Sequence, residues 1–341
     1  MPRLGLRYCR RVPQRTGAPR VTVVMASYDH ADFVEEAVAS VLAQSVEDLE
    51  LIVVDDGSSD GTPDLVAALD DDRLTLVRLP DNRAVHPRAT ALGLARGELV
   101  AFQNSDDVWA PTKLEAQLAA LDDTTVSASF TGVSLVDAAG RPTTVSWLTG
   151  VFDTTPRSQE QWLRHFFDAG NALCISSAIC RRRDLLAVGG FDESLVQLSD
   201  LDLWVRLAAL GRFEVLDAPL THMRVVDGRN ASAPSDAVTS RGTLEWARVL
   251  GRYTRRPVQP WLDTAFPEVV EGRRSRPVRL ARLARHGWRH GGAAQRLFGD
   301  RLLEHLLTRP AAREAVVADL GAGVIHEFLE QRGRIRVDVG G

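Results

Sequence analysis

The chain has 341 residues, of which 45% are hydrophobic and 25% are charged, and its formal net charge is −4 at pH 7. This length exceeds the usual size of one domain, and the apolar content is enough for a large core. The acidic balance argues against a nucleic-acid partner, and no apolar run approaches the roughly 18 residues of a membrane-spanning helix. Three cysteines without the spacing of a zinc site or a disulfide framework fit a reducing compartment, so we expect a cytoplasmic protein.

Strand and helix patterns alternate from residue 21 to about residue 121. Short apolar strands are expected at 21–26, 51–54, 74–79 and 99–102, and helical spacing of apolar residues follows each of them. Alternation of this regularity predicts an α/β fold with a mostly parallel central sheet flanked by helices.

The pattern becomes irregular after about residue 126. A long connection at 137–170 is a candidate lid, and a strand is expected at 173–180. A helix at 200–210 and closing strands at 213–216 and 220–225 follow.

The sequence predicts three regions. The first is a basic N-terminal arm at 1–20, and the second is a catalytic domain at 21–235. The third is a helical, arginine-rich C-terminal region at 236–341, because the composition changes near residue 235.

Polar and mostly acidic residues follow three of the predicted strands. Ser27 and Tyr28 follow the first strand, Asp56 ends the second, and Asp106 and Asp107 follow the strand at 99–102. The carboxyl ends of parallel strands are where an open α/β sheet binds its ligand. Adjacent carboxylates there suit a divalent cation that carries a substrate's phosphates, which predicts a phosphate-handling enzyme.

Four ordered motifs, spread over residues 21 to about 230, resemble the family 2 glycosyltransferases with the GT-A fold. They are VMASYD at 24–29, VVDDGSSDGT at 53–62, ARGELVAFQNSDDVW at 95–109, and GGFDESL at 189–195 with SDLDLWVRL at 199–207. The resemblance implies an inverting transferase that moves a sugar from a nucleotide-sugar to an acceptor hydroxyl. The acceptor can be a glycan, a lipid-linked sugar or a small molecule.

The resemblance also implies a nucleotide site. Ser27, Tyr28 and Asp56 would hold the base, with the Asp56 carboxylate accepting the N3–H of uracil or thymine, hence a UDP- or dTDP-sugar. Arg88 would lie near the diphosphate, although a solvated helix arginine is an equal alternative. For Asp56 and its neighbour Asp55, the alternative is capping of a turn.

The family's metal motif, Asp-x-Asp-Asp, falls on Asp106 and Asp107, with Asn104 in place of its first aspartate. The resemblance implies that these two residues bind Mg²⁺ or Mn²⁺ and that Asp106 also contacts the nucleotide. Two acids can suffice because diphosphate and water fill the other positions of the ion. The alternative is that they cap the helix expected near Pro111.

Asp200 matches the second position of the family's Glu-Asp motif, with Ser199 in the first, and the resemblance implies that it is the general base. A helix N-terminus would keep it ionised, and helix capping is the alternative. Asp202 and Trp204 are expected to shape the acceptor pocket, with Glu193 nearby, although Trp204 fits a core position equally well.

The segment 277–290 predicts a helix with several arginines near one face. That face could lie on the anionic inner surface of a membrane, or it could pack within the protein. The arginines are Arg279, Arg282, Arg285 and Arg289.

Two rival functions remain open. A non-catalytic nucleotide-sugar-binding protein would explain Asn104, Ala89 and Ser199, which depart from the family's usual residues. A nucleotidyltransferase shares the alternating pattern, but a glycine-rich basic loop would then follow the first strand.

Overall fold

The structure is a computed structural model that describes residues 8–10, 17–82, 86–226, 228–230, 232–269, 272 and 274–334. The chain divides into two compact units, each described here by itself. The first contains Met1–Gln159 and Asn171–Pro234, and the second contains Glu160–Gly170 and Ser235–Gly341. Residues 160–170, which the sequence places in a candidate lid, therefore belong to the helical second unit.

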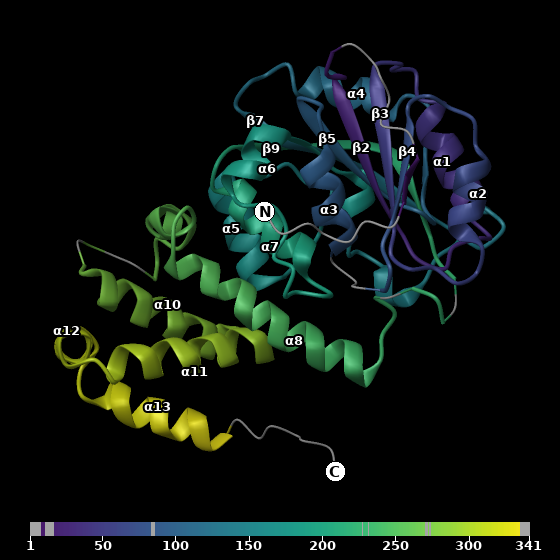
Figure 1. Ribbon diagram of the computed structural model, residues 1–341. Coiled ribbons are helices and arrows are strands. Elements are labelled where there is room, and N and C mark those ends of the chain that lie inside the picture. Colours follow the sequence, from purple (N-terminus) through teal and green to yellow (C-terminus); the bar gives the residue numbers. More distant parts are fainter. Residues whose placement is uncertain are drawn as a thin grey trace. The chain divides into compact units, whose positions relative to one another are not determined.

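The first unit is built on a nine-stranded sheet in the order β1-β4-β3-β2-β5-β8-β7-β9-β6 (Figure 1). β2 pairs in parallel with β3 and β5, and β3 pairs in parallel with β4, whereas β8 is antiparallel to both β5 and β7. The predicted α/β fold is confirmed, and the sheet is mixed because β1, β6 and β8 are each antiparallel to their neighbours. The strands are β1 (Tyr8–Arg10), β2 (Val21–Ser27), β3 (Leu49–Asp55), β4 (Leu74–Arg78), β5 (Leu99–Asn104), β6 (Val108–Trp109), β7 (Val126–Val136), β8 (Ile179–Arg181) and β9 (Arg212–Arg224).

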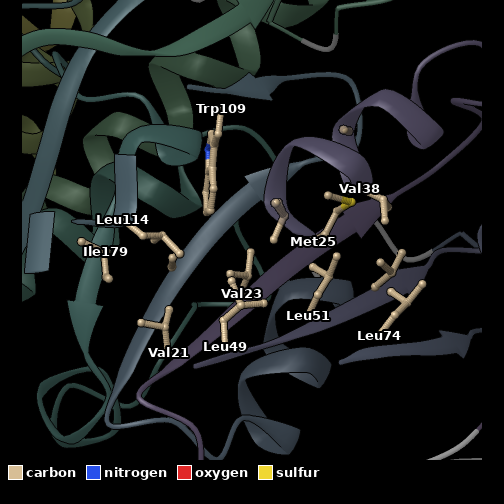
Figure 2. Close-up of a cluster of buried hydrophobic side chains, with 14 of the residues drawn as sticks. Val21, Val23, Met25, Val38, Leu49, Leu51, Leu74, Trp109, Leu114 and Ile179 are labelled. Atoms are coloured by element: carbon tan, nitrogen blue, oxygen red, sulfur yellow. The ribbon is translucent and has the colours of Figure 1, made fainter. Parts of the chain in front are cut away.

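Helices cover both faces of the parallel part of this sheet. Alternate residues of β2 and β3 point to one face, where Val38 and Leu114 pack against them (Figure 2). The opposite face is covered by α3, which contacts β2 and β3. The helices of this unit are α1 (Val34–Leu42), α2 (Thr62–Ala68), α3 (His86–Leu94), α4 (Lys113–Ala120), α6 (Arg182–Ala187) and α7 (Ser199–Ala208), with short 3₁₀ turns η1 (Ser146–Leu148) and η2 (Ile175–Ser177).

Two predicted segments differ from the structure. The expected strand at 173–180 is instead the 3₁₀ turn η2 followed by the three residues of β8. The two expected closing strands are one long strand, β9, which runs parallel to β7 with a register shift between Thr131 and Val133. The short break between the predicted strands coincides with this irregularity rather than with a chain reversal.

The second unit is helical. It begins with α5 (Gln159–Asp168), whose apolar residues lie at helical spacing and are buried: Trp162, Leu163, Phe166 and Phe167. A helix thus replaces part of the loop that was expected. The other helices are α8 (Asp236–Leu250), α9 (Leu262–Ala265), α10 (Arg276–His290), α11 (Ala293–Leu307), α12 (Pro310–Leu320) and α13 (Gly323–Arg334), with 3₁₀ turns η3 (Gly251–Thr254) and η4 (Gln259–Trp261).

The arginine face of α10 packs within this unit. Its apolar side buries Leu280, Leu283 and Trp288. Its arginines form ion pairs with acidic residues of other segments: Arg279 with Asp263, Arg282 with Asp319, and both Arg285 and Arg289 with Glu327. Of the two arrangements expected for this face, the structure shows the one in which it packs within the protein.

None of the helices in the described ranges is both long enough and apolar enough to cross a membrane.

Candidate active site

The parallel register of β2, β3 and β5 brings the predicted polar residues to one edge of the sheet. Ser27 is level with Asp55, and Asn104 is level with the residue before Ser27. Ser27 and Asp56 are buried, whereas the Tyr28 side chain is 43% exposed. The three residues predicted to hold a nucleobase therefore follow the ends of two adjacent strands.

A neighbouring acid, Asp55, has one oxygen bound and one free. Its Oδ2 accepts a hydrogen bond from the Ser58 backbone N–H at 3.2 Å, so Asp55 does close the turn, as the alternative predicted. Its Oδ1 and the Ser27 Oγ are buried and have no hydrogen-bond partner within the described segments. Burial raises the pKa of Asp55. Unpaired buried polar atoms are costly, which marks this strand end as a place where a ligand's polar group or a water would fit.

Three donors hold the carboxylate of Asp107. Its Oδ1 accepts from the Arg224 backbone N–H at 3.0 Å, and its Oδ2 accepts from Ser176 Oγ at 2.5 Å and from Asn104 Nδ2 at 3.1 Å. The side chain is almost fully buried. An ionised carboxylate offers about four acceptor sites, so most of the capacity of Asp107 is already used.

Asp106 is placed differently. Its side chain is 18% exposed, and its Oδ2 lies 3.9 Å from Nε2 of His30. None of the three donors that hold Asp107 bonds to this carboxylate. Burial raises the pKa of both aspartates, and the repulsion between them adds to the rise at Asp107. A cation near the pair would relieve that repulsion.

Arg88 lies beside these acids rather than in solvent. Its guanidinium donates from Nη2 to Asn104 Oδ1 at 2.7 Å. Burial lowers the pKa of Arg88, and the charges of Asp200, Asp106 and Asp107 act in the opposite direction. Because Asn104 is neutral, this contact leaves the positive charge of Arg88 without a bonded carboxylate among the residues that the structure describes. The alternative of a solvated helix arginine does not match this position.

Asp200 lies in the first turn of α7 and is half-buried. Its Oδ2 accepts from Asn171 Nδ2 at 2.8 Å, and its Oδ1 accepts from the Leu201 backbone N–H at 2.7 Å. Burial raises the pKa of Asp200, which these hydrogen bonds and the charge of Arg88 partly offset. The N-cap residue, Leu198, makes no side-chain cap, and the bond from the Leu201 N–H to Asp200 therefore meets the capping alternative in part.

The remaining predicted residues take other places. Asp202 is buried and forms an ion pair with Arg206, 2.6 Å from Oδ2 to Nη2, one helical turn away. Trp204 is fully buried and makes an edge-to-face contact with Phe130, so it belongs to the core. Glu193 lies exposed in the loop before α7. The first two stabilise the fold around Asp200 instead of lining an acceptor pocket.

Sequence reasoning missed four residues of this site. Ser176 contacts Asp107, Asn171 contacts Asp200, and His30 lies near Asp106. The fourth, Arg224, donates to the Asp107 carboxylate and to the Asp106 carbonyl. His30 directly follows the first motif and could have been considered. The other three are distant in sequence from the acids that they touch, so no local pattern pointed to them.

The residues fit a divalent cation that brings its own ligands. Within the described ranges, no group of three or more His, Cys, Asp or Glu side chains is arranged to hold a metal ion. Mg²⁺ and Mn²⁺ in phosphate-transfer sites are typically bound through one or two carboxylates together with substrate phosphates and water. The partly exposed carboxylate of Asp106 satisfies that requirement.

Residues 22–181 match the family model described as "Glycosyl transferase family 2". The first unit is thus similar to the family 2 glycosyltransferases over these residues. A relative in Bacillus subtilis (strain 168), "Putative teichuronic acid biosynthesis glycosyltransferase TuaG", is 42% identical over 127 residues, which are 36% of this chain and 50% of that protein. A second, from Escherichia coli, is "UDP-Glc:alpha-D-GlcNAc-diphosphoundecaprenol beta-1,3-glucosyltransferase WfaP", 29% identical over 40% of this chain and 52% of that protein. The chain thus spans about half the length of these relatives.

The fold extends the likeness beyond the matched residues. The structure of S. aureus TarS 1-349 in complex with UDP-GlcNAc has a TM-score of 0.57 to this chain at 17% sequence identity, and the match covers 92% of this chain and 88% of that one. At this identity the likeness concerns the fold alone. It agrees with the predicted GT-A fold followed by a C-terminal helical region.

Proposed function

We propose that this chain is an inverting glycosyltransferase that moves a sugar from a UDP- or dTDP-sugar to an acceptor hydroxyl, assisted by a divalent cation. The observation that carries the proposal is the placement of Asp200, a half-buried carboxylate held by two donors in the electrostatic field of Arg88. The two aspartates at the end of β5 act on the same guanidinium. Their nearness to one arginine supports a single site in which Asp200 is the base and Arg88 binds phosphate.

Asp200 is proposed as the general base. Its raised pKa brings it closer to the range in which a carboxylate accepts a proton from a hydroxyl, and its two hydrogen bonds fix its orientation. As the acceptor oxygen attacks the anomeric carbon on the face opposite the leaving group, Asp200 takes the hydroxyl proton. Attack from that face inverts the anomeric configuration.

The leaving group is a nucleoside diphosphate, whose negative charge must be stabilised as the sugar departs. Arg88 is proposed to donate to the diphosphate, since its bond to neutral Asn104 leaves its charge available. Mg²⁺ or Mn²⁺, when bound through Asp106, would neutralise diphosphate charge as a Lewis acid. For Asp107, predicted as a second ligand, the three donors already bound favour a role in holding the turn.

The identities of the nucleotide and of the acceptor are proposed from the name of one relative and from Asp56. The name of the E. coli relative gives UDP-Glc as its donor and a diphosphoundecaprenol-linked sugar as its acceptor, and this supports a uridine nucleotide and a lipid-linked acceptor here. The Asp56 carboxylate remains the proposed acceptor for the base N3–H. A peripheral membrane site is not part of the proposal, because the arginines of α10 are paired with Asp263, Asp319 and Glu327.

Calorimetry with UDP and with dTDP, with and without Mn²⁺, tests the binding half of the proposal. Binding of one of the two nucleotides that strengthens with Mn²⁺ is expected, and binding of neither in the presence of Mn²⁺ would refute the proposal. Donor hydrolysis then tests catalysis. Slow release of UDP from a UDP-sugar should fall by about 10²–10⁴ in Asp200→Asn with nucleotide affinity kept, because a base acts mainly in the transition state. Binding without turnover in the wild type would identify a non-catalytic binder.

A further inference from the structure

The 3₁₀ turn η2, Ile175–Ser177, lies against the end of β5 although it is about seventy positions away in sequence. Ser176 is fully buried and serves both as acceptor and as donor there. Its Oγ accepts from the Asn104 backbone N–H at 3.1 Å and donates to Asp107 Oδ2 at 2.5 Å. One hydroxyl therefore connects the last residue of β5 to the second aspartate of the pair.

Side chains of α4 and β6 donate hydrogen bonds to the backbone carbonyls of η2. Trp109 donates from Nε1 to the Ser176 carbonyl at 2.8 Å, and Gln117 donates from Nε2 to the Ser177 carbonyl at 2.9 Å. Lys113, fully buried, donates to Gln117 Oε1 at 2.7 Å and lies 3.9 Å from the centre of the Trp109 ring. These contacts fix where the Ser176 hydroxyl sits.

Ser176 is one of three donors to the Asp107 carboxylate, beside the Arg224 backbone N–H and Asn104 Nδ2. The backbone of the turn is held separately: Arg224 donates from Nε to the Asp106 carbonyl at 2.9 Å, and Gln103 donates from Nε2 to the Asp107 carbonyl at 2.8 Å. Ser176 differs from the other two donors because its hydroxyl also accepts from the Asn104 backbone N–H, so it connects the Asp107 side chain to the end of β5. Since one peptide bond joins Asp106 to Asp107, a shift of Asp107 after loss of this connection would also move the Asp106 carboxylate.

We infer that Ser176 is a positioning residue, which holds Asp107 so that the adjacent Asp106 carboxylate faces the diphosphate-bound cation. Asp107 then serves as the anchor of the turn and Asp106 as the group that meets the ion. Residues that orient a metal ligand without touching the metal typically change metal affinity by about 10–100-fold when they are removed. This inference rests on the proposed function, since it assumes that a cation and a nucleoside diphosphate bind here.

Ser177 offers a matched control. It lies in the same turn, is as deeply buried, and donates from Oγ to the Cys174 carbonyl at 2.8 Å; in the described part of the chain its hydroxyl bonds to neither aspartate. Ser176→Ala and Ser177→Ala each remove one buried hydroxyl and one donated hydrogen bond, and Ser176→Ala also removes the bond accepted from the Asn104 backbone N–H. A loss of stability common to the two variants can therefore be separated from an effect on the ion.

The test is a titration of Mn²⁺ at saturating UDP, followed by the electron paramagnetic resonance signal of the free ion, with thermal unfolding of each variant alongside. Ser176→Ala should weaken Mn²⁺ binding about tenfold or more, whereas Ser177→Ala should change it less than about twofold. If both variants bind Mn²⁺ as the wild type does, or both lose it equally, the inference is wrong while the proposed function stands. If the wild type binds no Mn²⁺ with UDP, both fail.

A second variant keeps the test decisive if Ser176→Ala does not fold. Trp109→Phe preserves an aromatic ring under Lys113 but removes the indole N–H that holds the Ser176 carbonyl. It should weaken Mn²⁺ binding in the same direction and by a smaller factor. An Mn²⁺ affinity equal to that of the wild type in folded Trp109→Phe would contradict the positioning role of the turn.

Discussion

The hydrogen bond from Asn171 to Asp200 should set the pH range in which the enzyme works. The bond, 2.8 Å long, stabilises the ionised carboxylate and so opposes the rise in pKa that burial causes. A hydrogen bond to a charged group contributes about 1.5–3 kcal/mol. Since each pKa unit corresponds to about 1.4 kcal/mol, Asn171→Ala should raise the pKa of Asp200 by about 1–2 units.

The sign of the effect on turnover follows from the role of a base. As the proposed base, Asp200 would act only when it is unprotonated, so kcat should fall as the pH drops through its pKa. In Asn171→Ala this acidic limb should move to higher pH by about 1–2 units, while the rate on the alkaline plateau changes much less. A fixed fractional loss at every pH would instead indicate that Asn171 only positions the carboxylate.

The assay is kcat measured across pH with saturating donor and Mn²⁺, in wild type, Asn171→Ala and Asp200→Asn. Asp200→Asn supplies the background rate, and thermal unfolding shows whether Asn171→Ala is folded, since Asn171 also accepts a hydrogen bond from the Leu173 backbone N–H. An acidic limb that stays in place in folded Asn171→Ala would refute the reasoning. It would mean either that this bond does not tune the base or that another group is the base.

Three further outcomes are expected. Burial lowers the pKa of Lys113 to about 7, so between pH 7 and 10 this group binds protons more strongly in the unfolded chain than in the folded one, and stability rises with pH. From pH 7 to 9 this one group should add about 2 kcal/mol to the free energy of unfolding, measured in urea. Lys113→Met should lack this gain. Arg88→Ala should weaken UDP binding at least about tenfold in calorimetry, because it removes the cation beside the acids of the site, and an unchanged affinity would place the diphosphate elsewhere. Glu327→Gln should lower the unfolding free energy by less than about 1 kcal/mol, because its pairs with Arg285 and Arg289 are partly exposed; a larger loss would show that these pairs act as a tightly coupled network.

The sequence predicted those parts of the fold in which periodicity is local. The first strands and helices followed because their apolar residues repeat at the spacing of a strand or a helix, as with Val34, Val38 and Val41 in α1. The apolar residues of α5 repeat in the same way, but the turn residues around them in 137–170 obscured the pattern. The segment at 173–180 was misassigned because an apolar run around two serines resembles a strand, whereas Ser176 and Ser177 form a turn.

In the candidate site, too, the local patterns could be predicted and the long-range contacts could not. Residues that belong to motifs, such as Asp106 and Asp200, were predicted from the sequence. What could not be predicted is which of two adjacent aspartates is already satisfied by protein donors, because those donors come from distant segments. Ser176 and Arg224 reach Asp107 from 69 and 117 positions away. Spacing along the chain carries no information about such contacts.

That distance has a consequence for how the enzyme is made. As the chain leaves the ribosome, the strands carrying the nucleotide motifs emerge first, yet the turn at Asp107 gains its last donor only with Arg224. A fragment ending at residue 181, where the match to the family model stops, would contain the acidic pair and Ser176 but neither Arg224 nor Asp200. A nascent chain that has not yet reached β9 therefore contains the acidic pair but cannot form the complete site. The site is completed only when β9 pairs with strands made much earlier, which is a long-range and therefore slow contact.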